Sequence, residues 1–462
     1  MSNAAFNKYL LLGSLSIFLI ITGPSLFSEG MFLDGLMYAG IADNLANGSG
    51  SFWNLFYTKT LYTQFNEHPP LVFGLQALFF KLFGSGIWVE RLYSLCTFLA
   101  ISFLTIQLWK LISGSYRHSW VLVLFFATIP LMTWSTANNM LENTMSIFTI
   151  SSAYFYFLGQ KKEQNFYFLV SGVMLFLAFL SKGFTGLFVW TLPFVYYLFG
   201  LRKPETKMIS SALVVVGTLI IAGITFLVIP ESLAVVVRYF NRQVKGSLEN
   251  VQTVSNRFYI VGKIVTELLI PIGMLLLLHV ILRLKKINWG KNELFRAGIS
   301  FIAVGLSGVL PIVISLKQSG FYIVCTFPFF VIGLVALFKG QLDLLDALLR
   351  KVVKEGKWLK RVVITLISLM LLTAIISGQR VGRDEERIAM VKQVMLYVDQ
   401  EEILKVNPSM MKDWGLHAYF CRYTGISLSD QELDQKYILT EKASNDKLVL
   451  QSGRYFLYRI QK

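Results

Sequence analysis

The chain has 462 residues, of which 55% are hydrophobic, 15% aromatic and only 15% charged. A soluble core of this size cannot absorb so many apolar side chains, so the composition excludes a water-soluble enzyme and indicates a polytopic membrane protein. Much of the formal net charge of +16 comes from Lys and Arg residues in short loops between apolar stretches, where these side chains would bind anionic lipid head groups. The charge therefore gives no reason to expect nucleic acid as a partner.

Apolar stretches long enough to cross about 30 Å of hydrocarbon recur along the chain. Because lipid offers the backbone no hydrogen-bond partners, we expect these stretches to be helices. We predict about eleven transmembrane helices. Their approximate positions are 8–28, 87–109, 119–136, 143–159, 166–181, 184–200, 209–229, 259–283, 297–315, 321–338 and 361–378. The first is expected to be an anchor rather than a cleaved signal peptide, because no small-x-small cleavage site follows its apolar core.

Lys and Arg residues in the short loops predict the orientation of these helices. With the amino terminus in the cytoplasm, the inner connections are the basic segments "QKKEQN", "RKPETK", "RLKKINWGKNELFR" and "KGQLDLLDALLRKVVKEGKWLKR". The outer face then carries residues 29–86, the short turn before Glu142, the region around Lys182, residues 230–258, residues 316–320 and the tail from 379. We therefore expect a multi-pass protein of the inner (plasma) membrane whose active site and C-terminal domain are extracytoplasmic.

Two segments outside the predicted spans have structure of their own. "PPLVFGLQALFFKLFG" in the first outer loop is apolar but amphipathic, and it predicts a helix lying in the membrane interface. The tail begins with a charged helical pattern and continues with short β-like runs such as "KYILT" and "RYFLYRI". The chain thus divides into a membrane module over 1–340, a cytoplasmic amphipathic segment and last span over 341–378, and a small α/β domain over 379–462.

Ionisable residues gather at the predicted outer face. They are Asp34, Asp43, Glu67, His68, Glu142 and Lys182. Each alone can be a polar cap on the end of a span, but ionisable groups near membrane depth favour function. Carboxylates and cations on one side of the membrane are what a transferase needs when its donor is a phosphate-linked lipid. Asp43 lies nine residues after Asp34 and would face another side of a continuous helix, so we interpret it as a helix-surface residue.

A series of short segments occurs in the order and spacing of a known family over roughly residues 5–340. The segments include "FLDGLMYAG", "NEHPPL", "RLYSL", "LENTMSIFTI", "SKGFTG", "RYFNRQVKGS" and "KQSGFYIVCTFPFF". On these segments the chain resembles the aminoarabinose transferases and protein O-mannosyltransferases of the GT-C superfamily. The resemblance implies an all-α polytopic membrane fold with juxtamembrane helices on the outer face, followed here by the small C-terminal α/β domain.

The resemblance also implies an inverting glycosyltransferase. Its donor would be a polyprenyl-phosphate sugar, and its acceptor a hydroxyl or phosphate of a lipid, a glycan or a protein. Asp34 would take the proton of the acceptor, and Glu142 would be a second catalytic carboxylate that positions the acceptor. We expect apolar surroundings and a second carboxylate to raise the pKa of Asp34. The candidates for substrate binding are Tyr38, Glu67, His68, Arg91, Lys182, Arg238, Arg242, Lys245 and Lys317.

The chain departs from the family pattern at several positions. His68 stands where a Lys usually precedes the double proline, so a cation there would depend on pH. Glu142 replaces an Asp, and Gly35 takes the place where a second acid often sits. Lys317 and the pair Gly320–Phe321 stand where a basic residue usually meets a Tyr. These departures bear on the donor and the pH optimum more than on the class of reaction.

The sequence requires no cofactor. Glu67 and His68 are candidate ligands of a divalent metal, although two adjacent residues make an incomplete ligand set. The three cysteines, Cys96, Cys325 and Cys421, are scattered without metal or redox spacing.

The alternative function is a transporter or flippase of lipid-linked glycans. It would share the apolar spans and the basic inner loops. A transporter should, however, show charges inside the spans along a path, whereas this chain keeps most of its charges at the ends of the spans.

Overall fold

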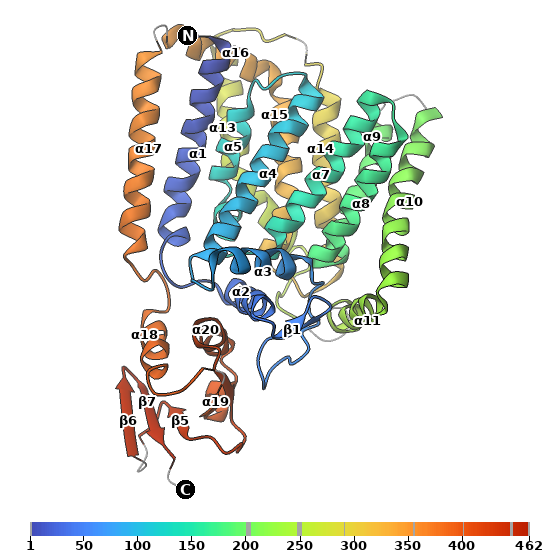
Figure 1. Cartoon of the computed structure of the whole chain (residues 1–462). Coiled ribbons are helices and arrows are strands. Elements are labelled where there is room, and N and C mark those ends of the chain that lie inside the picture. The colour runs from blue at the N-terminus through green and yellow to red at the C-terminus, as the bar shows by residue number, and fades with distance from the viewer. Residues whose placement is uncertain are drawn as a thin grey trace.

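The computed structural model describes residues 2–199, 205–246, 252–290, 292–353, 356–400, 402–443 and 447–460. Long helices run side by side in a bundle, and a small mixed domain extends from one end (Figure 1). The described residues contain eight helices that are long and apolar enough to cross a membrane. They are Ala4–Leu26, Val89–Ser113, Asn165–Lys182, Ile209–Val228, Tyr259–Leu284, Phe295–Ile314, Gly320–Leu337 and Lys357–Gly378.

The membrane part consists almost entirely of helices. In chain order its elements are α1 (Asn3–Leu26), α2 (Leu33–Ala46), β1 (Gly50–Ser51), β2 (Asn54–Leu55), α3 (Leu71–Phe83), α4 (Val89–Ser113), α5 (Ser119–Thr128), α6 (Pro130–Ala137), α7 (Leu141–Lys162), α8 (Asn165–Lys182), η1 (Phe184–Thr191), α9 (Leu192–Leu198), α10 (Glu205–Val228), α11 (Pro230–Tyr239), the π-helical η2 (Phe240–Lys245), α13 (Tyr259–Leu284), α14 (Phe295–Val309), η3 (Leu310–Ile314), η4 (Gly320–Thr326), α15 (Phe327–Leu337), α16 (Lys339–Val352) and α17 (Lys357–Gly378).

The predicted number of eleven transmembrane helices is not confirmed, because three expected spans differ from straight apolar helices. The stretch 119–136 is the pair α5 and α6, bent by 78°. Pro130 at the break lacks an N–H and disfavours helical backbone at Ile129, which is extended. The helix α7 buries polar side chains such as Asn143 and Ser152, which make it less hydrophobic than a typical span. The stretch from Phe184 to Leu198 is a shorter apolar helix. If the bent pair α5 and α6 is counted as one span, the described residues contain up to nine spans.

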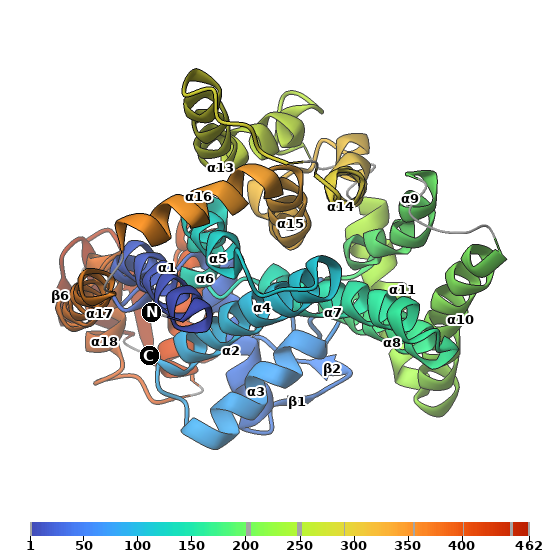
Figure 2. The ribbon, with the colours of Figure 1, turned by 90° about the horizontal axis from the view of Figure 1, so that it is seen from above.

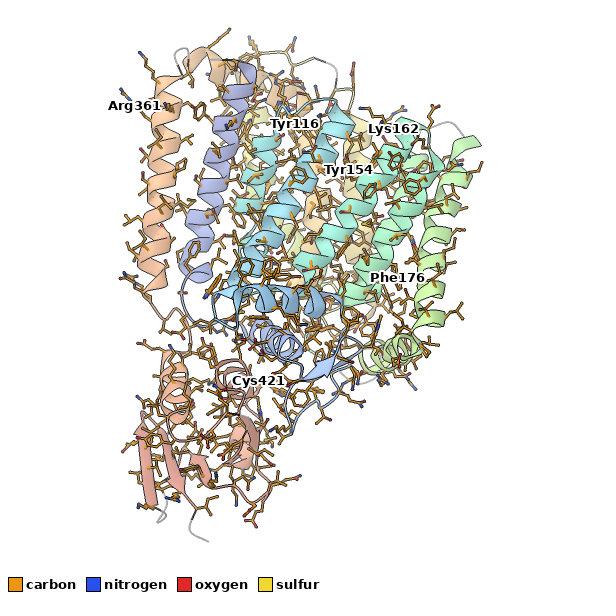
Figure 3. All side chains as sticks on the ribbon, in the orientation of Figure 1. Tyr116, Tyr154, Lys162, Phe176, Arg361 and Cys421 are labelled. Atoms are coloured by element: carbon orange, nitrogen blue, oxygen red, sulfur yellow. The ribbon has the colours of Figure 1, made fainter. Side chains whose placement is uncertain are left out.

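The two ends of the bundle differ in composition. Figure 1 shows α2, α3 and α11 lying across the end from which the C-terminal domain extends, where the sequence predicted interfacial helices. At the opposite end α16 crosses the bundle beside α13 and α15 (Figure 2). Lys162 and Arg361 lie at this second end (Figure 3). The basic connections and the polar outer segments of the sequence are therefore separated to opposite ends of the bundle.

The C-terminal domain is a five-stranded sheet with three helices. Its elements are α18 (Glu385–Val394), β3 (Ile403–Val406), α19 (Pro408–Met411), α20 (Trp414–Thr424), β4 (Ser427–Ser429), β5 (Tyr437–Thr440), β6 (Lys447–Ser452) and β7 (Tyr455–Arg459). The strand order is β4-β3-β5-β7-β6. Strand β3 runs parallel to its neighbours β4 and β5, and strand β7 runs antiparallel to its neighbours β5 and β6. Leu404 pairs with Leu428 and Leu439 with Leu457, and all four are buried. The predicted small α/β domain is present.

Arg422 of α20 joins this domain to the membrane part. Its nearly buried guanidinium lies 2.8 Å from the carboxylate of Glu90 on α4 and 3.3 Å from that of Asp43 on α2. The same guanidinium donates hydrogen bonds to the carbonyl oxygens of Ser85 and Gly86, and the donor–acceptor distance is 3.0 Å in each. Asp43, which the sequence indicated as a helix-surface residue, is thus a partly buried anchor for a segment 379 residues away in the chain.

We expect Arg422→Ala to loosen the C-terminal domain, because Glu90 would remain buried without its counter-charge. The loss of stability should be about 3–5 kcal/mol. Arg422→Lys should lose less, since it keeps the charge but not the forked geometry. Thermal unfolding and limited proteolysis of the linker 378–384 measure both effects. Wild-type stability and wild-type cleavage rate in Arg422→Ala would contradict this anchoring role.

Candidate active site

Asp34 is held at the first turn of α2 by the residues that follow α6. The side-chain oxygen of Asn138 accepts a hydrogen bond from the N–H of Phe32 (2.8 Å), and the side-chain nitrogen of Asn139 donates to the carbonyl of Gly35 (3.2 Å). A Cβ added to Gly35 would collide with the carbonyl oxygen of Asn138. This contact explains why the second acid of the family pattern is absent here, since a side chain at position 35 would force α2 away from α6.

The surroundings of Asp34 suit a general base. Burial raises the pKa of its carboxyl to about 6, the positive charge of Lys182 opposes this shift, and the negative charges of Glu142 and Glu67 add to it. A carboxylate with such a pKa is ionised at neutral pH and is a stronger base than an ordinary aspartate.

We expect transfer activity to fall below about pH 6, because the protonated carboxyl cannot accept a proton. The rate at limiting substrate should fall about tenfold per pH unit on the acidic side. Initial rates between about pH 4.5 and about pH 8 measure the acidic limb of the pH–rate profile. In Glu67→Gln this acidic limb should move to lower pH, since a negative charge that raises the pKa of Asp34 is removed. An acidic limb that is absent, or that stays in place in Glu67→Gln, would contradict the assignment of the base.

Glu142 and Lys182 form a buried ion pair. Glu142 lies in the first turn of α7 and Lys182 in the last turn of α8, and their side chains are hydrogen-bonded to each other. The Lys182 ammonium also lies 5.1 Å from the ring centroid of Phe321 and 5.0 Å from that of Tyr322 on η4. The second carboxylate oxygen of Glu142 is buried and has no hydrogen-bond partner among the described residues. The pair fixes one cation beside Asp34 in surroundings that exclude most water.

His68 is a neutral imidazole at neutral pH. Burial lowers its pKa well below the usual value, and the charges of Lys182 and Lys317 lower it further. The Nε2 atom lies 3.2 Å from the hydroxyl of Tyr38, whereas the buried Nδ1 atom has no partner among the described residues. The predicted pH-dependent cation at this position is therefore replaced by a neutral hydrogen-bonding group.

Glu67 has partners other than His68. Its carboxylate accepts a hydrogen bond from the hydroxyl of Tyr62 (2.6 Å) and lies 3.5 Å from Nε of Arg242. The Arg242 guanidinium stacks 4.3 Å from the centroid of the Tyr62 ring. Within the described ranges no group of three or more His, Cys, Asp or Glu side chains is arranged to hold a metal ion. A divalent metal at Glu67 and His68 stays a prediction.

The predicted cations of the later outer loops reach the first loop to different extents. Arg238 on α11 donates a hydrogen bond to the side chain of Asn66 (3.0 Å). Asn66 directly precedes Glu67, which is the partner of Arg242. Lys317 donates to the side chain of Gln243 (2.9 Å), and burial lowers its pKa. Lys245 is exposed at the end of η2. Arg238 and Arg242 thus contact Asn66 and Glu67, the two residues before His68, and Lys317 acts on the pKa of His68 itself.

Arg91 lies outside this group of residues. Its two terminal nitrogens donate hydrogen bonds to the backbone carbonyls of Ser25, Ser28, Gly30 and Ala137. These bonds tie the end of α1 and the start of the first loop to α4 and α6. Substrate binding by Arg91 stays a prediction, and the observed contacts give this side chain a structural role.

A cavity of about 480 Å³ opens beside the ion pair. It is lined by His68, Lys182, Phe184, Thr185, Phe188, Thr191, Tyr239, Gln243, Ser307, Gly308, Pro311, Ile312, Ser315, Lys317 and Tyr322. The wall contains apolar side chains together with two ammonium groups, an imidazole and several hydroxyls. Such a wall fits an amphiphile whose polar part is anionic.

Tyr239 and Tyr322 are cavity residues that the sequence did not single out. The hydroxyl of Tyr239 donates a hydrogen bond to the carbonyl of Lys182 (3.3 Å). Both tyrosines fall inside segments on which the family resemblance rests, "RYFNRQVKGS" and "KQSGFYIVCTFPFF". These segments were the only sign in the sequence that the two tyrosines belong to the site. An aromatic residue near the end of a span is common in any membrane protein and gives no sign by itself.

Comparisons with known proteins find one family model and several solved structures to which this chain is similar. Residues 67–229 match the family model described as dolichyl-phosphate-mannose-protein mannosyltransferase. The fold is similar to ArnT from Cupriavidus metallidurans without ligand, with a TM-score of 0.68 and 16% identity over 99% of this chain and 98% of that one. The same protein bound to undecaprenyl phosphate gives a TM-score of 0.67 at 15% identity, over the same shares of the two chains.

A second solved structure shares part of its length with this fold. The oligosaccharyltransferase of Archaeoglobus fulgidus in the apo form gives a TM-score of 0.53 at 11% identity, over 91% of this chain and 64% of that one. A comparison with curated proteins gives no match. Residues 67–229 are thus similar to one family model, and the chain shares the fold of ArnT over almost its whole length.

Proposed function

We propose that the chain is an inverting glycosyltransferase that moves a sugar from a polyprenyl-phosphate donor to a hydroxyl or phosphate of a lipid, glycan or protein acceptor. One observation carries the proposal. Asp34, whose pKa is raised to about 6, lies in the charge field of Lys182 and Glu142, and Lys182 lines a cavity whose wall combines apolar side chains with two ammonium groups. A base and a phosphate site at one membrane boundary are the two parts that such a transfer needs.

The cavity suits the lipid part of the donor. Phe184, Phe188, Pro311 and Ile312 form an apolar wall for the isoprenoid chain. Lys182 and Lys317 on the polar side would neutralise the phosphate. The relative of known structure that shares this fold over its whole length, ArnT, binds undecaprenyl phosphate, which supports a polyprenyl phosphate as the carrier.

The reaction is a single displacement. The acceptor oxygen loses its proton to the Asp34 carboxylate and attacks the anomeric carbon from the face opposite the phosphate. The bond between the anomeric carbon and the phosphate oxygen breaks, and its electron pair stays on the phosphate, beside Lys182 and Lys317. One displacement inverts the configuration of the anomeric carbon. The group that leaves is the polyprenyl phosphate, which gains the charge that the two ammonium groups stabilise.

Other side chains position these groups. Glu142, hydrogen-bonded to Lys182, holds the ammonium in place. If the Tyr38 hydroxyl donates to Nε2 of His68, the ring proton lies on Nδ1, the atom without a partner. That N–H would donate to a phosphate oxygen as a neutral group. His68 would therefore perform the binding role of the usual lysine without adding a positive charge.

The proposal places the reaction on the extracytoplasmic side of the inner membrane. Lys162 and Arg361 lie at the end of the bundle opposite the C-terminal domain (Figure 3), and basic loops favour the cytoplasmic side. The helix α2, whose first turn contains Asp34, and the C-terminal domain share the other end (Figure 1). The amino terminus would then be cytoplasmic.

The experiment measures sugar transfer in proteoliposomes from a panel of polyprenyl-phosphate hexoses and pentoses. Wild type should release polyprenyl phosphate from one donor, and Asp34→Asn should slow release by about 10²–10⁴ while leaving donor binding unchanged. Asp430→Asn, an exposed carboxylate of the C-terminal domain, is the matched control and should behave as wild type. If no donor is turned over and labelled lipid-linked glycan instead crosses the bilayer, the protein is a transporter and the proposal fails.

A further inference from the structure

A second cavity, of about 530 Å³, lies where the C-terminal domain joins the membrane part. Its lining consists of Leu26–Met31, Leu36, Ile87, Trp88, Glu90–Leu92, Leu95, Gly378–Val381 and Tyr423. None of these residues lines the donor cavity, the cavity of about 480 Å³ beside Lys182 in which the proposed donor would bind. The walls are the end of α1, the start of α4 and the linker that follows α17. These three segments meet at the boundary of the apolar bundle, where lipid head groups lie.

The apolar wall of this cavity continues along the outside of α4. Leu92 and Leu95 line the cavity, and Leu99 and Phe103, one and two turns further along, are 44% and 59% exposed. At the other edge Trp88 is 53% exposed, at the depth where tryptophan is enriched in membrane proteins. An acyl chain lying against α4 would therefore pass from the cavity into the bilayer without crossing a polar surface.

The polar wall offers one cation that the protein itself does not use. Glu90 is paired with Arg422 (2.8 Å) and Glu29 with Lys392 (2.7 Å), while the terminal nitrogens of Arg91 bind backbone carbonyls. Arg380 is exposed and forms no ion pair with any described residue. A guanidinium in this position is a binding group for a phosphate.

We propose that a bilayer phospholipid with an anionic head group binds in this cavity, its phosphate on Arg380 and one acyl chain along α4. The cavity is smaller than a whole phospholipid, so the remaining chain length extends into the bilayer. The lipid would contact both sides of the joint at which the linker pairs with the first loop, through Glu29 N–H to Arg380 O (3.0 Å) and Gly382 N–H to Glu29 O (2.9 Å). Binding therefore fixes the C-terminal domain against the start of the loop that carries Asp34.

The test is native mass spectrometry of the full chain, purified in detergent and titrated with dioleoyl phosphatidylglycerol. Wild type should retain one lipid. Arg380→Gln should weaken retention about tenfold, since it removes a charge-assisted contact with the phosphate. Leu92→Trp fills the apolar part and should abolish retention, with Leu95→Phe as the replacement if that variant does not fold. Arg383→Gln, in the same linker but outside the cavity, is the matched control and should bind as wild type.

Three results would overturn this inference. Dioleoylglycerol, which has the same chains and no phosphate, would be retained as tightly as the phospholipid. Arg380→Gln and Arg383→Gln would weaken retention equally. Undecaprenyl phosphate would displace the phospholipid in competition, which would make the cavity a second site for the carrier lipid instead.

Discussion

The buried ion pair of Glu142 and Lys182 is the interaction on which the candidate active site depends. An unpaired ammonium at this depth would cost several kcal/mol, so Lys182 requires a carboxylate within reach. The pair closes the gap between the starting turn of α7 and the last turn of α8, and the rings of Phe321 and Tyr322 enclose the ammonium from η4. Three separate helical segments are thereby fixed around one positive charge.

The same charge links the two parts of the proposed chemistry. Lys182 lies on the wall of the donor cavity and also acts on Asp34, whose pKa it lowers against the larger effect of burial. Glu142 partly offsets the positive field, so Asp34 keeps a pKa near 6. A cation that neutralises a leaving phosphate would normally weaken a nearby carboxylate base. Pairing that cation with a second carboxylate allows both functions in one site.

The parts of the fold that depend on local sequence could be predicted. Spans follow from runs of about 20 apolar residues, and the small α/β domain follows from alternating strands in the tail. The predicted number of spans is not confirmed, because a sequence window does not distinguish a straight apolar helix from the pair bent at Pro130 or from α7 with its buried polar side chains. The orientation of the spans predicted that Asp34, Glu142 and Lys182 share one face of the membrane, and the order of segments shared with a family predicted their roles.

Features set by distant contacts could not be predicted. The neutral state of His68 depends on burial and on the charges of Lys182 and Lys317 around it. Asp43 was interpreted as a helix-surface residue from its spacing to Asp34, and the sequence gives no sign of its partner Arg422, which lies 379 residues away. That contact also bears on the C-terminal domain, because it joins the domain to α2 and α4. Through Arg422 and the lipid proposed at its joint, the domain would support the loop that carries Asp34.

The most direct test of the account is the affinity for undecaprenyl phosphate of a variant in which the buried pair is neutral. The double substitution Glu142→Gln and Lys182→Met removes the cation without leaving a buried carboxylate unpaired. Binding measured in detergent should weaken by about 10–100-fold. Arg361→Gln, which removes a cation at the opposite end of the bundle, should bind as wild type. Equal affinity in the double variant and wild type would contradict the claim that Lys182 holds the phosphate of the carrier lipid.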